Sequence, residues 1–206
     1  MSRYWRVYLV LMMDDFNSLL LTGARVRLRA VDPGDVAKLF RIISNSRAHL
    51  ETWLPWVEYV QTEDDERHIV DQWTYEMQVR TAIHLCVISE DEIAGVVSTS
   101  PIDWVNQRTS IGYWIRPEFI KRGLATESTA VLLCYMFEKL RLHRIFIQAA
   151  TGNAASNRVI QKIGFRHEGV LRENERVKNL FYDHNIYGMT NEDFKSLKEH
   201  LSSFLR

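Results

Sequence analysis

Apolar and polar residues alternate along some stretches of the chain and recur every three or four residues along others. Residues 24–31 (ARVRLRAV) alternate as a half-exposed strand does, and DPGD at 32–35 opens a helix that runs to about Ser46. Thr62 followed by Asp65 approximates a capping box, which predicts the start of a second helix. The apolar residues of that helix recur at helical spacing: Ile69, Trp73 and Met77.

Strands dominate the next part of the chain. Alternation predicts an antiparallel meander of three strands at 82–89, 93–100 and 108–115, the first two joined by a tight turn. The remaining elements are expected in this order: a helix at 125–140, a short buried strand at 143–150, a helix with its C-cap at Gly164, two strands at 166–173 and 180–189, and an amphipathic helix from about Asn191. This order predicts a mixed α/β sheet with flanking helices.

Length and composition narrow the class of protein. At 206 residues, the chain is expected to form one domain with a substantial core. Its 26 basic and 26 acidic residues are balanced and scattered, so neither nucleic acid nor a membrane is expected as a direct partner. Cys86 and Cys134 each lie in an apolar run, which favours reduced core thiols over a disulfide or a metal site. We expect a cytoplasmic protein.

Residues 1–20 form an N-terminal extension whose role the sequence leaves open. Two arginines precede the apolar run 7–13, as in a signal peptide, but no small-residue cleavage site follows. The run is far shorter than the roughly 20 residues that a membrane span needs. Met12 or Met13 could also be the natural start of the protein.

One short turn carries candidate chemistry. The stretch IKRGLATES at 120–128 lies between a predicted strand and a predicted helix, so its backbone N–H groups include the unpaired first donors of that helix. The helix dipole and the missing side chain at Gly123 would let a pyrophosphate approach these donors closely. Taken alone, an ordinary capped surface turn is the better interpretation. The residues that a phosphate seat would use are Lys121, Arg122, Gly123, Leu124, Ala125 and Thr126.

Three motifs carry a family resemblance. RPEFIKRGLATES at 116–128, followed by TGNAASNRVIQKIGF at 151–165, resembles the acetyl-CoA signature of the GNAT N-acetyltransferases. With LETWLPW at 50–56, the chain is similar to the ribosomal-protein N-terminal acetyltransferases of the RimJ/RimL type. The family usually has Gln or Arg where this chain has Ile120, and often Gly where it has Lys121.

The resemblance implies a domain organisation and a fold. It covers about residues 21–190 as the acetyltransferase domain, with 191–206 as a C-terminal helix. The implied fold is that of the GNAT acyl-CoA N-acyltransferases, a mostly antiparallel sheet in which two parallel strands splay apart. The glycine turn would hold the pyrophosphate of the cosubstrate acetyl-CoA, and no metal is implied.

The resemblance also implies a role for specific residues around the splayed strands. The backbone of Tyr113, Trp114 and Ile115 would pair with the pantetheine arm and offer an N–H to the developing oxyanion. Asn153 and Asn157 would bind pantetheine amide groups. Many members use a tyrosine for the leaving thiolate where this chain has Ile160, so Ser156 is expected to hydrogen-bond the sulfur instead. From its position alone, Ser156 is better explained as a helix cap.

The resemblance assigns the general base to Glu175, between the last two strands. Composition alone would make Glu175 a solvated loop residue. Four nearby residues are alternative candidates for the general base: His167, Glu168, Asp183 and His184. Trp53 and Trp56 are expected either to line the groove for the acceptor or to pin the loop onto the core.

The pKa of the acceptor amine helps to distinguish an α-amine from a lysine side chain as the substrate. At pH 7, roughly one α-amine in ten is neutral but only about one lysine in a few thousand, a difference on the order of 3.5 kcal/mol. A single glutamate therefore suits an α-amine better than a lysine. Together with the resemblance, which implies ribosomal proteins as acceptors, this leads us to expect direct acetyl transfer to a protein or peptide N-terminus, without an acyl-enzyme. A small amine (polyamine, amino sugar or antibiotic) and a CoA-binding module without turnover remain alternatives. The oligomeric state is left open, a homodimer included.

Overall fold

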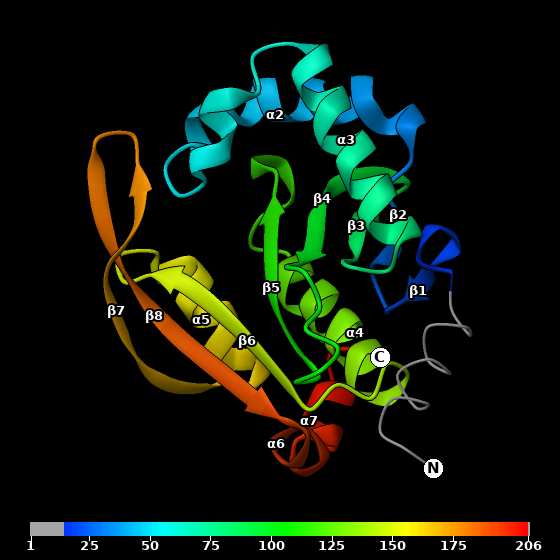
Figure 1. Cartoon of the computed structure of the whole chain (residues 1–206), viewed down its shortest axis with the longest axis vertical. Coiled ribbons are helices and arrows are strands. Elements are labelled where there is room, and N and C mark those ends of the chain that lie inside the picture. Colours follow the sequence, from blue (N-terminus) through cyan, green and yellow to red (C-terminus); the bar gives the residue numbers. More distant parts are fainter. Residues whose placement is uncertain (1–14, 206) are drawn as a thin grey trace.

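Eight strands form one sheet in the order β1-β2-β3-β4-β5-β6-β8-β7 (Figure 1). This computed structural model describes residues 15–205. The strands are β1 Leu20–Thr22, β2 Arg27–Ala30, β3 His84–Ser89, β4 Glu92–Thr99, β5 Arg108–Ile115, β6 Arg144–Ala150, β7 Arg166–Val177 and β8 Leu180–Thr190. The α-helices are α2 Val36–Leu50, α3 Glu63–Gln78, α4 Leu124–Glu138, α5 Ala154–Ile163, α6 Asn191–Ser196 and α7 Lys198–Ser202. Four 3-10 turns join them: η1 Phe16–Ser18, η2 Pro33–Asp35, η3 Pro55–Tyr59 and η4 Pro117–Phe119.

The parallel pair at the middle of the sheet is short. β5 and β6 pair at only three positions, from Arg108 opposite Arg144 to Ser110 opposite Phe146. Beyond Ser110, β5 stays with β4 as far as Ile115, whereas β6 stays with β8. The two central strands therefore separate toward their C-terminal ends, which confirms the splayed pair (Figure 1).

Successive residues of β5 reach opposite faces of the sheet. The Tyr113 hydroxyl contacts Ser156 in α5, while the Trp114 ring lies beside Trp56 in η3, with 6.4 Å between the ring centroids. The loop between α2 and α3 thus lies on one face of the strand gap, and α5 lies on the other.

Helix α4 forms the centre of the core. Twelve of its fifteen residues are buried, so it lacks the polar face of a surface helix. The buried apolar residues of the same core come from both halves of the sheet, for example Leu28 in β2 and Ile145 in β6. Because α4 is enclosed, the turn that precedes it is held in a fixed place at the end of β5.

Local signals in the sequence are confirmed at several element ends. Thr62 and Asp65 form the predicted capping box at the start of α3. Gly164 ends α5 in the left-handed conformation with φ +102°. The tight turn between β3 and β4 has positive φ at both Glu90 and Asp91, as a two-residue hairpin of type I′ requires.

Three features differ from the sequence-based expectation. Strand β1 was not expected, and it pairs with β2. Strand β7 continues to Val177, so Glu175 lies within a strand rather than in a connecting segment, because pairing with β8 stabilises a polar stretch that lacks alternation. The expected C-terminal helix is two short helices, separated at Leu197, whose side chain packs against Gly164.

Most of the N-terminal extension lies outside the described residues. Phe16, its first described aromatic residue, is buried in the core. Among residues 15–205, no helix is both long enough and apolar enough to cross a membrane.

Glu66 in α3 is a buried carboxyl group without a local partner. It is 1% exposed, and within the described part of the chain its Oε2 atom has no hydrogen-bond partner. Burial raises the pKa of Glu66 to about 7, because the charged form loses its hydration.

Replacing Glu66 with Gln is expected to remove a pH dependence of stability. The folded-state pKa lies above the unfolded value of 4.5. The contribution of this carboxyl group to the free energy of unfolding is therefore fully present below pH 4.5 and is lost as the pH rises through 7. The loss approaches roughly 3 kcal/mol at pH 8. Urea denaturation at pH 5 and pH 8 measures it, with the exposed Glu63→Gln on the same helix as the control. Equal pH dependence in Glu66→Gln and the wild type would contradict the prediction.

Candidate active site

The turn before α4 contains backbone donors without an acceptor in the described part of the chain. Lys121 and Gly123 have φ of +61° and +79°, and Gly123 is the N-cap of the helix. Among residues 15–205, no group accepts a hydrogen bond from the N–H groups of residues 123–126, and the first helical bond runs from Glu127 to the Gly123 carbonyl. Free N–H groups at a helix N-terminus suit an anion, so the predicted phosphate seat has the donors that it needs.

The side chains of the turn differ in what they could offer a bound phosphate. Arg122 pairs with Glu90 at 2.9 Å, and its guanidinium lies 4.7 Å from the centroid of the Phe119 ring. Leu124 and Thr126 are buried. Backbone groups are therefore the main feature that this turn offers a phosphate.

Arg25, which precedes β2, also reaches this turn. Its Nη1 atom donates to the Arg122 carbonyl at 2.7 Å, and its Nε atom donates to Glu127 at 2.7 Å. Arg25 and Glu127 are 102 positions apart, so no local pattern in the sequence could have related them.

The gap between β5 and β6 is spanned by two hydroxyl groups. The Tyr113 hydroxyl lies 3.0 Å from Ser156 Oγ, across the point where the strands separate. Burial raises the pKa of Tyr113 to about 12, although the hydrogen bond with Ser156 opposes that shift. The phenol therefore stays protonated near neutral pH and can donate a hydrogen bond. Sequence reasoning considered only the backbone of Tyr113; strand alternation could have shown that its side chain lies opposite Trp114.

The two asparagines at the start of α5 already have partners within the protein. Asn153 caps the helix by accepting from the Ser156 N–H at 3.1 Å. Asn157 donates to two backbone carbonyls, and its Oδ1 accepts from Asn185 and Tyr187, each at 2.8 Å. An amide has two donor hydrogens and two acceptor positions, so that of Asn157 is fully used. The amide of Asn157 therefore positions α5, and its expected contact with pantetheine stays a prediction.

A bulge in β7 directs Glu175 toward His184. Leu171 pairs with His184 and Glu175 with Tyr182, so the three residues 172–174 face a single residue of β8. The Glu175 carboxylate lies 3.4 Å from His184 Nε2, and His184 is 7% exposed. Bulges of this kind redirect side chains, and they are frequent next to active sites.

The tryptophans of the α2–α3 loop occupy different places. The Trp53 ring lies 6.0 Å from the Tyr182 ring and covers the Gly152 turn at the end of β6. Trp56 lies beside Trp114. Both tryptophans are half-buried, so each combines core packing with an exposed edge. Glu51 and Lys178 add an ion pair of 2.9 Å between this loop and the β7–β8 hairpin.

The two cysteines are free, as predicted. Burial raises the pKa of Cys86 to about 12 and that of Cys134 to about 11. Both thiols are therefore protonated near neutral pH and are poor nucleophiles. The His84 ring stacks on Trp73, whereas the Cys86 thiol faces Asp35.

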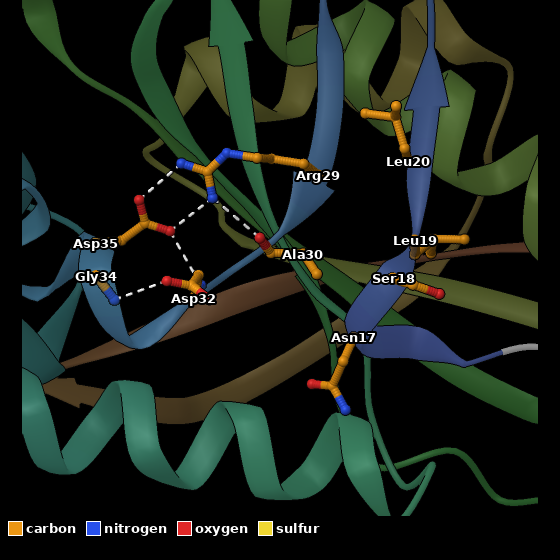
Figure 2. A pocket seen from close by; sticks show the side chains of 9 residues that line it. All are labelled: Asn17, Ser18, Leu19, Leu20, Arg29, Ala30, Asp32, Gly34 and Asp35. Carbon is orange, nitrogen blue, oxygen red and sulfur yellow. Dashed lines mark hydrogen bonds and ion pairs between the residues drawn. The ribbon is translucent and has the colours of Figure 1, made fainter.

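A pocket of about 590 Å³ lies elsewhere, beside β2 and η2 (Figure 2). Two of its charged residues are paired with each other: Arg29 donates two hydrogen bonds to Asp35, at 2.6 and 2.7 Å. Burial by itself would raise the pKa of Asp35, but the bonds from Arg29 and from the Asp32 backbone lower it below its ordinary value. This paired cluster braces the start of α2 and is separate from the strand gap.

Comparison with known proteins agrees with this geometry. Residues 25–166 match the family described as the acetyltransferase (GNAT) domain, and the chain belongs to that family. It is 30% identical to the putative ribosomal N-acetyltransferase YdaF of Bacillus subtilis over 84% of this chain and 95% of that protein. It is 29% identical to the ribosomal-protein-serine acetyltransferase of Escherichia coli over 79% of this chain and 90% of that protein.

A solved structure supports the same conclusion. A RimL ribosomal L7/L12 alpha-N-protein acetyltransferase in complex with coenzyme A aligns with a TM-score of 0.82, at 26% identity, over 85% of this chain and 99% of that chain. The protein is thus a GNAT N-acetyltransferase with acetyl-CoA as its cosubstrate. Among the described residues, no group of three or more His, Cys, Asp or Glu side chains is placed to hold a metal.

Replacing Gly123 with Val is expected to nearly abolish CoA binding. A β-branched residue is strained at φ +79°, and its Cβ would lie 3.0 Å from the Arg25 guanidinium. Lys121→Ala should weaken binding only about two- to fivefold, as one exposed charge near a helix end does. Isothermal titration with CoA measures both, and wild-type affinity in Gly123→Val would contradict the assignment of this turn.

Proposed function

We propose that this N-acetyltransferase modifies the N-terminal α-amine of a protein, with ribosomal proteins as the favoured class of acceptor. The observation that carries the proposal is the two-sided strand gap. The hydroxyl pair of Tyr113 and Ser156 lies on one face, and the tryptophans of the α2–α3 loop lie on the other. A donor and an acceptor could therefore approach the gap from opposite sides of the sheet.

The donor side uses the turn and the hydroxyl pair. Acetyl-CoA supplies the acetyl group as a thioester and leaves as a thiol. The free N–H groups of residues 123–126 would hold its pyrophosphate. Ser156 and Tyr113 would stabilise negative charge on the departing sulfur by hydrogen bonding, which takes the place of the tyrosine missing at Ile160. The unpaired edge of β5 near Tyr113 to Ile115 would offer an N–H to the developing oxyanion.

The acceptor side uses Glu175. Its carboxylate would take a proton from the α-ammonium group, directly or through water, so that the neutral amine can attack. This carboxylate lies 3.4 Å from His184 Nε2, beside the bulge of β7. Trp53 and Trp56 would present flat apolar surface to the peptide that follows the amine.

Two observations favour an α-amine over a small polycationic acceptor. Two relatives, at 30% and 29% identity, carry names of ribosomal acetyltransferases. The carboxylate of Glu51, on the loop above the gap, is already paired with Lys178. Acetylation of a small amine such as a polyamine is the second candidate function. The spermidine N(1)-acetyltransferase of Escherichia coli is 26% identical over 71% of this chain and 75% of that protein.

Peptides and small amines distinguish the two candidates. Peptides with the N-terminal sequences of ribosomal proteins should be acetylated at the α-amine, as read by mass spectrometry. The same peptides with a blocked N-terminus and an internal lysine should react roughly a few hundredfold more slowly, in proportion to the neutral amine fraction at pH 7. Acetylation of spermidine or amino sugars alone would contradict the proposal, and CoA binding without turnover of any amine would identify a binding module.

Glu175→Gln is expected to lower kcat/KM for such a peptide by about 10²- to 10³-fold at pH 7. The deficit should shrink as the pH rises through the α-amine range, because more of the free amine is then neutral without help. Glu173→Gln in the same strand is the control, because within residues 15–205 no side-chain hydrogen bond of Glu173 is found, and its backbone N–H donates to Asp183 at 2.8 Å. An unchanged rate and pH profile, with acetyl-CoA still bound, would remove Glu175 from the mechanism.

A further inference from the structure

Glu127 is a fully buried carboxylate in the first turn of α4. Its side chain is 0% exposed, and it accepts three hydrogen bonds from the segment before β2. The backbone N–H of Arg25 donates at 2.6 Å, that of Val26 at 3.2 Å, and the Arg25 Nε atom at 2.7 Å. A buried charge with this many donors is well compensated, so the contact fixes Arg25 rigidly against α4.

From this position, Arg25 controls one peptide group of the turn. Its Nη1 atom binds the Arg122 carbonyl at 2.7 Å. A trans peptide is planar, so its C=O and N–H groups point in opposite directions. With the Arg122 carbonyl held toward Arg25, the N–H of Gly123 points away from Arg25. That N–H is the first in the row of free donors at residues 123–126.

The same guanidinium lies against Gly123 itself. A Cβ atom at Gly123 would lie 3.0 Å from Nη2 and 3.2 Å from Nη1. Within the described residues, Nη2 has no hydrogen-bond acceptor, and the Arg25 side chain is 55% exposed. The guanidinium is thus packed beneath the turn and also has one donor group available to solvent.

We propose that Arg25 is a positioning residue for acetyl-CoA, held by Glu127, which orients the Arg122–Gly123 peptide so that its N–H faces the pyrophosphate. The inference rests on the proposed phosphate seat at residues 121–126. It extends the site to a residue that lies outside the turn and outside the motifs of the family resemblance. A direct contact of Nη2 with the 3′-phosphate is the competing role.

The test compares Arg25→Ala with Arg27→Ala. Arg27 has the same charge, lies two residues away, and makes an exposed ion pair with Asp91, so it controls for loss of a nearby cation. Arg25→Ala should weaken binding of CoA and of dephospho-CoA by the same factor, about tenfold. It should raise KM for acetyl-CoA by a similar factor while kcat, KM for the acceptor and the pH profile stay unchanged. Arg27→Ala should bind both ligands as the wild type does.

Two conservative variants separate positioning from general stabilisation of the fold. Arg25→Lys keeps the charge but cannot donate to Glu127 and to the Arg122 carbonyl in the same fork, so it should not restore affinity. Glu127→Gln keeps an acceptor oxygen for the two backbone N–H groups but loses the ion pair, so it should weaken CoA binding in the same direction. Thermal denaturation identifies any variant that is not folded, and affinities are compared only among folded variants.

Three results would overturn the inference. These are an affinity of Arg25→Ala equal to that of the wild type, full restoration of affinity by Arg25→Lys, and a loss seen with CoA but absent with dephospho-CoA. The last result would assign Arg25 to the 3′-phosphate. Hydrogen exchange of the wild type tests the phosphate seat separately: CoA binding that leaves the exchange of residues 120–128 unchanged would refute the seat, whatever Arg25 does.

Discussion

The separation of β5 from β6 is the constraint on which the rest of the structure depends. Three residue pairs hold the strands together, and beyond Ser110 each strand keeps only its outer neighbour. Backbone groups on the inner edge of β5 then need another partner, because buried N–H and C=O groups are rarely left unpaired. An extended ligand with amide groups can supply that partner. The fold thereby creates a binding position from backbone alone, which tolerates variation in the side chains around it.

The elements beside the gap are held by contacts that are distant in sequence. Glu127 and Arg25 connect α4 to the segment before β2, and Lys178 connects the β7–β8 hairpin to the loop after α2. Asn157 joins α5 to β8 through two hydrogen bonds and to the end of β6 through a third. Such contacts stabilise the relative positions of separate elements, so a transfer reaction that depends on placing two reactants can proceed without a covalent intermediate. The raised pKa values of the two free thiols agree with that view.

Much of the fold could be predicted because its signals are local. The capping box at Thr62, the left-handed C-cap at Gly164 and the two-residue turn at Glu90 and Asp91 each follow from the conformational preference of a few neighbouring residues. The extent of β7 could not be predicted in this way. Its polar residues form a strand only because β8 supplies the hydrogen bonds, so Glu175 was expected in a connecting segment.

The same distinction between local signals and long-range contacts applies to the candidate site. The sequence by itself determined the family, the glycine turn before an apolar helix, and the serine and asparagines that open α5, because each is a short motif with its own local physics. Only the tertiary structure decided that the Tyr113 hydroxyl meets Ser156, that a bulge directs Glu175 to His184, and that Arg25 lies beneath Gly123. The reason is that such contacts join residues up to 102 positions apart, and chain packing rather than local preference brings them together.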